Sequence, residues 1–130
     1  MQARASGAWW CTDGYKSKFV REIRLVFRTL GTPLAARYNG NEVPLCKVEG
    51  EYHWHQHPDT DELFLVIEGE LDMELRDRTE NLVQGDLIVV PRGTEHRPCA
   101  RKGEVKLFVM DADGTPNTGD GETAFKPIEV

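Results

Sequence analysis

The sequence predicts an all-β fold, and three observations support that prediction. From Leu34 onward, short runs of apolar and β-branched residues alternate with turn residues, mainly Asn, Gly, Pro and Asp. The runs recur about every 8 to 12 residues, and no helical pattern separates them. The chain has 130 residues, 39% of them apolar, which suits one domain with one hydrophobic core.

The predicted strands differ in how their two faces are patterned. Residues 71–76 alternate apolar and charged side chains, which predicts one solvent-facing side. Residues 63–67 are apolar on both faces, which indicates a strand covered on both sides, for example by a partner subunit. The expected strands are 34–38, 43–48, 52–57, 63–68, 71–76, 87–90, 95–99 and 105–110.

The segment before the strands has two interpretations. Residues 16–30 fit an amphipathic helix, with Phe19, Ile23 and Phe27 on one face, and Gly31 and Pro33 would end it. Residues 22–28 also alternate as a strand does; we favour a short N-terminal helix. We therefore expect an irregular segment over 1–15 and a single domain over 16–130, with a barrel core at about 34–110.

Charge and composition exclude several classes of partner. The net charge of −6 argues against nucleic acid, which requires a basic surface. No run approaches the roughly 18 apolar residues of a membrane-spanning helix, and residues 1–13 lack the apolar core of a secretory signal. Cys11, Cys46 and Cys99 are an odd number without a CxxC pair, which favours reduced thiols. We expect a cytoplasmic protein.

The tail after the last strand contains oxygen-bearing residues at a spacing like that of a calcium loop, beginning at Asp111 and ending at Glu122. Pro116 stands where such a loop requires glycine, and no helices flank the segment. An ordinary surface loop is therefore expected.

Three of the four histidines are His53, His55 and His57. Alternate side chains of a strand point to the same face, so a strand here directs all three imidazoles to one side. Several neutral imidazoles in one barrel interior are costly unless something satisfies their lone pairs. A divalent transition metal does so.

Two further residues are candidates for the same site. Glu62 follows His57 across a turn and begins the most apolar strand, and His96 follows the turn at residues 91–94. Each also has an ordinary interpretation: Glu62 as part of a solvated acidic turn, and His96 as a hydrogen-bonded histidine at the barrel rim.

These residues resemble the two motifs of the cupin superfamily, in its small single-domain form. The first motif, G(X)5HXH(X)3-4E(X)6G, is matched by His55, His57, Glu62 and Gly69, with Gly50 one residue closer than the pattern asks. The second, G(X)5PXG(X)2H(X)3N, is matched by Gly85, Pro91, Gly93 and His96, with Ala100 in place of the final Asn. The stretch from Lys47 to Phe64 is also similar to small cupins described as resembling the cupin part of sugar-phosphate isomerases.

The resemblance implies an antiparallel double-stranded β-helix, a jelly-roll barrel that is often a homodimer. It also implies one divalent metal bound by His55, His57, Glu62 and His96. His53 is then left over; it either lines the pocket as a weak catalytic candidate, such as a proton carrier, or is a hydrogen-bonded interior or rim histidine. The change to Ala100 removes a polar contact outside the ligand set.

Such a site indicates the general kind of chemistry but not a specific reaction. Three histidines and a carboxylate leave positions on the ion for water or a small oxygen-rich molecule. Iron, manganese, nickel, zinc and copper all suit these ligands. The alternatives are an O2-dependent oxidation, a Lewis-acid isomerisation or lyase reaction, and a non-catalytic metal- or ligand-binding or sensor module. The sequence does not choose among them.

Overall fold

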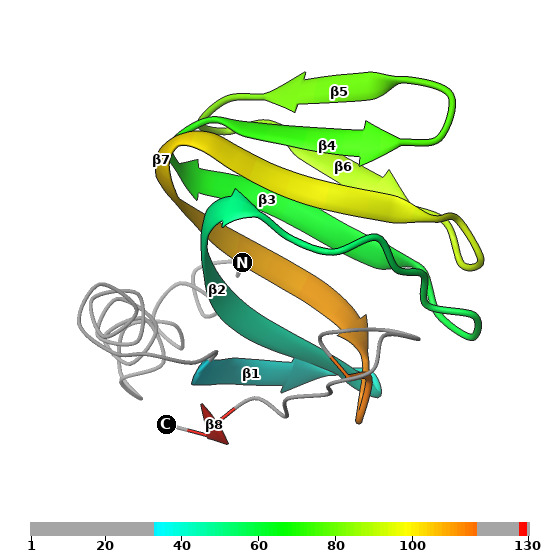
Figure 1. The fold of residues 1–130 in the computed structure, drawn as a ribbon. Coiled ribbons are helices and arrows are strands. Elements are labelled where there is room, and N and C mark those ends of the chain that lie inside the picture. The colour runs from blue at the N-terminus through cyan, green and yellow to red at the C-terminus, as the bar shows by residue number, and fades with distance from the viewer. Residues whose placement is uncertain (1–32, 117–127, 130) are drawn as a thin grey trace, which may run out of the picture.

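A computed structural model describes residues 33–116 and 128–129. The described residues are organised as strands and their connections (Figure 1). The segments expected over 1–15 and 16–30, Cys11, and the end of the tail at Glu122 lie outside the described residues. The strands are β1 (Pro33–Tyr38), β2 (Asn41–Glu51), β3 (Glu62–Glu68), β4 (Leu71–Leu75), β5 (Thr79–Leu82), β6 (Leu87–Val90), β7 (His96–Ala112) and β8 (Ile128–Glu129).

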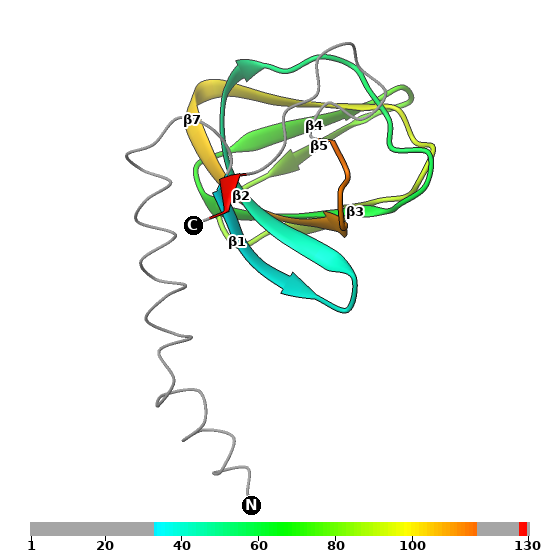
Figure 2. The ribbon, with the colours of Figure 1, turned by 90° about the horizontal axis from the view of Figure 1, so that it is seen from below.

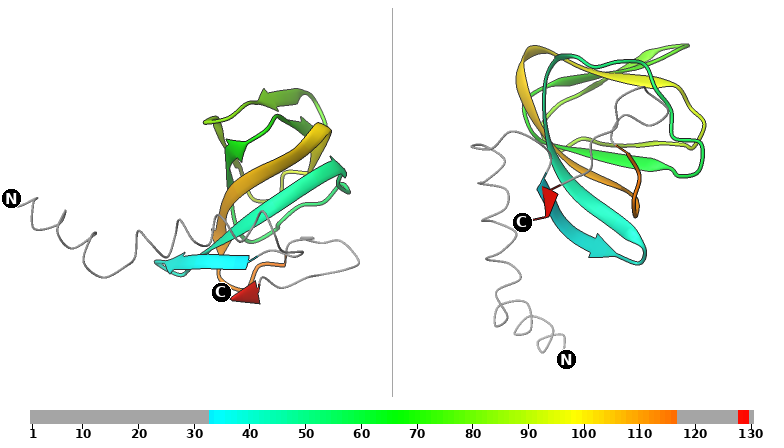
Figure 3. Two further views of the ribbon diagram at one scale, coloured as in Figure 1. Left: turned by 90° about the vertical axis from the view of Figure 1, so that its left-hand side faces the viewer. Right: turned by 60° about the horizontal axis from the view of Figure 1, so that its bottom comes forward.

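Strand β7 organises the sheet. Its first half pairs with β4, its second half pairs with β3, and β2 runs along both halves. The strand order is β5-β4-β7-β2-β1-β8, and β6 pairs with β3. All of these ladders are antiparallel except the short one between β1 and β8, which lie side by side at one end of the sheet (Figure 3). The strands curl around a common core, as the view in Figure 2 shows. The all-β antiparallel barrel that the sequence predicts is confirmed.

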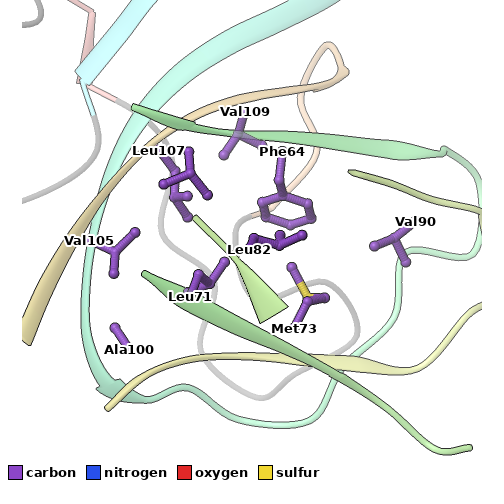
Figure 4. Close-up of a cluster of buried hydrophobic side chains, with 10 residues drawn as sticks. Phe64, Leu71, Met73, Leu82, Val90, Ala100, Val105, Leu107 and Val109 are labelled. Carbon is purple, nitrogen blue, oxygen red and sulfur yellow. The ribbon is translucent and has the colours of Figure 1, made fainter. Parts of the chain in front are cut away.

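The core lies between the two halves of the curled sheet (Figure 4). Leu71 and Met73 of β4 are fully buried, while Asp72 and Glu74, which alternate with them, face outward and pair with Arg101 of β7. The alternation predicted for residues 71–76 is thus confirmed. The core cluster consists of Phe64, Val66, Leu71, Met73, Leu82, Val90, Ala100, Val105, Leu107 and Val109.

Three predictions about the strands are wrong. Residues 96–99 and 105–110 belong to one strand, β7, whose register with β2 shifts at the bulge between Val48 and Gly50, and Glu95 precedes that strand. Residues 52–57 form no strand of their own; an isolated bridge joins His55 to His96, and the Tyr52 N–H donates to the Pro98 carbonyl. Strand β5 was not predicted, because its sequence, Thr-Glu-Asn-Leu, lacks apolar alternation.

Two other expectations can be compared with the described residues. Within 33–116 and 128–129, the structure has no helix long and apolar enough to span a membrane. Cys46 and Cys99 form no disulfide within the described residues, and Cys99 is buried.

Candidate metal centre

Four buried side chains from three separate parts of the chain meet at one end of the core. His55 and His57 come from the connection between β2 and β3, Glu62 is the first residue of β3, and His96 is the first residue of β7. One potential ligand atom from each lies within 4.8 Å of the others. None is more than 6% exposed. These four residues, called the His3Glu cluster below, have the composition and proximity of a site that can hold a metal ion.

Backbone hydrogen bonds bring the two sequence motifs together. The His55 N–H donates to the His96 carbonyl at 3.1 Å, and the His96 N–H donates to the His55 carbonyl at 2.9 Å. The Gly93 N–H donates to the His57 carbonyl at 2.9 Å. Arg92 adds two hydrogen bonds, from its backbone N–H and its Nε, to Asp61 Oδ1. These hydrogen bonds therefore hold the turn at residues 91–94 against the β2–β3 connection, which carries His55 and His57.

The rings of His55 and His96 are oriented by neighbouring carbonyls. His55 Nδ1 lies 3.0 Å from the His53 carbonyl oxygen, and His96 Nδ1 lies 2.9 Å from that of Thr94. A carbonyl only accepts, so each Nδ1 carries the proton and a neutral ring has its lone pair on Nε2. Burial lowers the pKa of His55 to about 4, so this ring is neutral at neutral pH.

Glu62 is the negative group of the cluster. Its Oε2 lies 2.9 Å from His57 Nε2 and 3.2 Å from His96 Nε2. Burial alone raises the pKa of Glu62, but the contacts with His57 and His96, when their ring nitrogens donate to the carboxylate, outweigh it and lower the pKa to about 2. The carboxylate is therefore ionised at neutral pH.

The contact between His96 and Glu62 provides a direct test of whether the cluster fits a cation. Because His96 Nδ1 already donates to Thr94, a neutral ring presents an Nε2 lone pair to the Glu62 carboxylate at 3.2 Å. Two buried acceptors facing each other are unfavourable unless a second proton or a cation lies between them. A divalent ion shared by both groups supplies that charge, and three imidazole nitrogens with one carboxylate suit a transition metal.

His53 does not share the interior with the other two clustered histidines. Its side chain is exposed, whereas those of His55 and His57 are 3% exposed. Residues 52–57 do not form a regular strand, so the strict alternation expected there is absent. The His53 ring stacks on Tyr52 at 4.3 Å between ring centres, and its carbonyl orients His55. A part for the His53 side chain in catalysis stays a prediction.

A cavity of about 90 Å³ opens beside the His3Glu cluster, and His55 and Glu62 form part of its wall. The other polar groups on its wall include Lys47, Tyr52 and Asp111. Burial, followed by the nearby Cys46 and Glu62, raises the pKa of Tyr52. Most of the remaining wall is apolar, from Pro44, Val48, Phe64, Pro98, Leu107 and Val109.

Asp111 is a cavity residue that the sequence does not predict. The sequence pattern indicates a surface loop there, yet Asp111 belongs to β7 and is only 4% exposed. The signal was present: Val105, Leu107 and Val109 are buried at alternate positions, and the same period directs residue 111 inward. Ala100, in place of the motif's Asn, lies in the apolar core and is 2% exposed.

Comparison with known proteins places these features in a family. The sequence pattern of the cupin domain matches residues 45–111. YdbB, an uncharacterized protein of Bacillus subtilis, is 48% identical over 72 residues, which cover 55% of this chain and 64% of that protein. The chain thus matches less than two thirds of that relative's length.

Two solved protein structures have a fold similar to that of this chain. A cupin-2 domain protein of Shewanella frigidimarina has a TM-score of 0.68 at 36% identity, covering 76% of this chain and 99% of that one. A protein of Neisseria meningitidis has a TM-score of 0.64 at 21% identity, covering 73% and 96%. The second likeness concerns the fold alone.

Proposed function

The chain belongs to the cupin family, and from that premise we propose that it is a metal-dependent enzyme acting on a small oxygen-bearing molecule. In this proposal His55, His57, Glu62 and His96 hold one divalent transition metal ion. The observation that carries it is the buried contact between His96 Nε2 and Glu62 Oε2, two groups that need a shared positive charge.

The charge and shape of the site support a substrate beside the ion. Three neutral histidines and the Glu62 carboxylate leave a divalent ion with a net charge of about +1, which attracts an anionic oxygen ligand. The adjoining cavity is walled largely by apolar side chains, which exclude bulk water and strengthen that attraction. When bound, the ion supplies Lewis acidity and, if it is redox-active, electron transfer.

Two reaction classes remain within the proposal, and they differ in what they consume. An O2-dependent oxidation requires iron or another redox metal and uses oxygen together with the substrate. A Lewis-acid isomerisation or lyase reaction proceeds without oxygen and accepts zinc or manganese. A non-catalytic binding module would hold the same molecule without turnover. Assays under nitrogen and under air, with each metal loaded in turn, distinguish the three.

The metal content of the purified protein tests the ligand assignment. We expect close to one transition metal ion per chain in protein purified without added metal. His57→Ala and Glu62→Ala remove two buried ligands, so both should lose most of the metal. His53→Ala is the matched control, because it removes an exposed histidine from the same cluster of sequence.

Two results would contradict the assignment. Full metal content in both ligand variants places the ion elsewhere, and loss of metal in His53→Ala alone means that the register of the histidines is different. Circular dichroism of each variant separates the loss of a ligand from the loss of the fold.

We also propose a cytoplasmic homodimer, assembled through the outer face of β3 and β6. Leu87 and Val89 of β6 are 55% and 48% exposed, and their strand partners on β3 are Leu65 and Leu63. These four residues form an uncharged apolar face. Because the chain carries a net charge of −6, two copies meet with least repulsion where neither presents a charge.

A further inference from the structure

Asp111 is a buried carboxyl group at the wall of the cavity beside the His3Glu cluster. It is 4% exposed, and within the described residues no hydrogen bond or ion pair of its side chain is found. Its counterpart across the ladder is Glu42, another acid. A buried carboxyl group without a partner is costly, so its persistence in a cavity wall points to a partner that arrives with a ligand.

The groups around Asp111 favour its protonated form. Burial, and then the negative charges of Glu62 and Glu42, raise the pKa of Asp111 to about 7, while His57 opposes this shift. With a pKa of about 7, the Asp111 carboxyl group is divided between its two forms at neutral pH: it accepts a hydrogen bond in either form and can also donate one when protonated. Tyr52 is the other hydroxyl-bearing group on this wall.

The rest of the wall restricts what the ligand can be. Six apolar residues dominate it, and Lys47 is its only cationic side chain among the described residues. The Lys47 ammonium group also lies 4.0 Å from Glu104. A phosphate group carries about two negative charges and is usually held by several donors or cations. The described part of the cavity wall offers no such set, which disfavours a sugar phosphate.

We propose that Asp111 is a ligand-contacting residue, and that the cavity takes a small monoanionic molecule with two adjacent oxygen atoms at one end and an apolar body. The oxygen pair would face the His3Glu cluster, the apolar body would lie against Phe64 and Val109, and the Asp111 carboxyl group would hydrogen-bond to a polar atom of the ligand. This inference rests on the proposed metal function, since the metal would bind the oxygen pair. Short 2-oxo acids belong to this class.

Binding of two matched probes to the metal-loaded protein tests the ligand class. 2-Oxobutanoate and 2-oxoglutarate share the same chelating end, but the second carries an additional carboxylate that would meet apolar wall and Asp111. Isothermal titration calorimetry should give tighter binding of 2-oxobutanoate, by about tenfold. Equal or tighter binding of 2-oxoglutarate, or no binding of 2-oxobutanoate, overturns the proposed class.

Substitutions at position 111 test the residue. Asp111→Leu removes the hydrogen bond and should weaken 2-oxobutanoate binding by about tenfold. Asp111→Asn keeps a donor and an acceptor at similar size and should weaken it by about threefold or less. Asp113→Asn, two residues further along and outside the cavity wall, is the control and should bind as the wild type does.

Metal content, measured in the same samples, separates the two proposals. If the wild type holds no metal, the proposed function fails and this inference fails with it. If every variant holds one ion per chain and Asp111→Leu binds 2-oxobutanoate as tightly as the wild type, only the inference about Asp111 fails.

Discussion

His55 and His96 are joined by a reciprocal pair of backbone hydrogen bonds, of 3.1 and 2.9 Å. The two residues lie 41 positions apart in the sequence (96 − 55), so this bridge closes one end of the barrel and aligns two histidine side chains in one step. Their ring centres are 4.3 Å apart. These backbone hydrogen bonds thus hold His55 and His96, two of the four residues of the His3Glu cluster, beside each other.

Gly69, at the end of the first motif, is predicted to be required for stability. Its φ is 101°, and a Cβ there would lie 2.9 Å from the Glu104 carbonyl oxygen and 3.1 Å from Val105 Cα. Gly103 has a similar φ of 113° but no atom within 4 Å of its Cβ position. We expect Gly69→Ala to lower the free energy of unfolding by about 3 kcal/mol and Gly103→Ala by about 1 kcal/mol.

Urea unfolding of the two metal-free variants beside the wild type measures this difference. Because the backbone angles are alike, the comparison isolates the steric contact with β7 from the cost of a positive φ. If both variants lose the same free energy of unfolding, β7 can move away from the added methyl group at position 69 without an energetic cost.

The cluster could be predicted from the sequence because its spacing is local and specific. The distances along the chain from His55 to Glu62 and Gly69, and from Gly85 to His96, reflect turns of fixed length. Each of those turns needs particular residues, such as glycine at a positive φ. The period-2 pattern of residues 71–76 likewise arises because one face of the strand is buried, so it correctly predicts which side chains face solvent.

Other features depend on contacts that leave no local pattern. The merging of two predicted strands into β7 depends on a bulge opposite Val48 and Gly50, and Gly103 suggested a break where the ladder continues. Asp111 comes beside Glu62 through the antiparallel pairing of β3 with β7, in which Leu63 lies opposite Met110, at 49 residues' separation (111 − 62). Its acidic, glycine-rich surroundings resembled a surface loop.

The apolar face of β3 and β6 leads to a prediction about assembly. Light scattering after gel filtration should give a dimer for the wild type. Leu87→Asp places a charge on a residue that is 55% exposed, so it should yield monomers without unfolding the barrel. Tyr38→Asp is the control, since Tyr38 is 64% exposed and lies on β1. A monomeric wild type, or a dimer unaffected by Leu87→Asp, argues against this interface.

Metal retention should depend on pH because histidine ligands must be neutral. The ordinary pKa of histidine is about 6.5, while burial lowers that of His55 to about 4. As the pH falls from about 6 to 4, protons increasingly replace the metal ion on the histidine nitrogens. Dialysis at a series of pH values followed by metal analysis should show progressive loss. Circular dichroism at each pH distinguishes release from unfolding, and full retention at pH 4 would contradict a histidine-based site.

Asp111 should make the metal-free protein less stable as the pH rises. Its pKa is raised from 3.8 to about 7 in the folded state, so between these values the folded state binds more protons than the unfolded state. The stability that the protonated group contributes is complete below about pH 4 and is lost as the pH rises through 7. Full loss amounts to about 4 kcal/mol at most.

Asp111→Asn removes this titration, so its stability relative to the wild type should increase between pH 4 and 8. Taking the difference between the two proteins cancels the opposite trend of His55, whose lowered pKa reduces stability as the pH falls from 6.5 to 4. Chemical unfolding at each pH measures the difference. A constant difference across this range would mean that Asp111 is ionised throughout. Metal loading should reduce the effect, because a cation beside Glu62 offsets the negative charge that raises the Asp111 pKa.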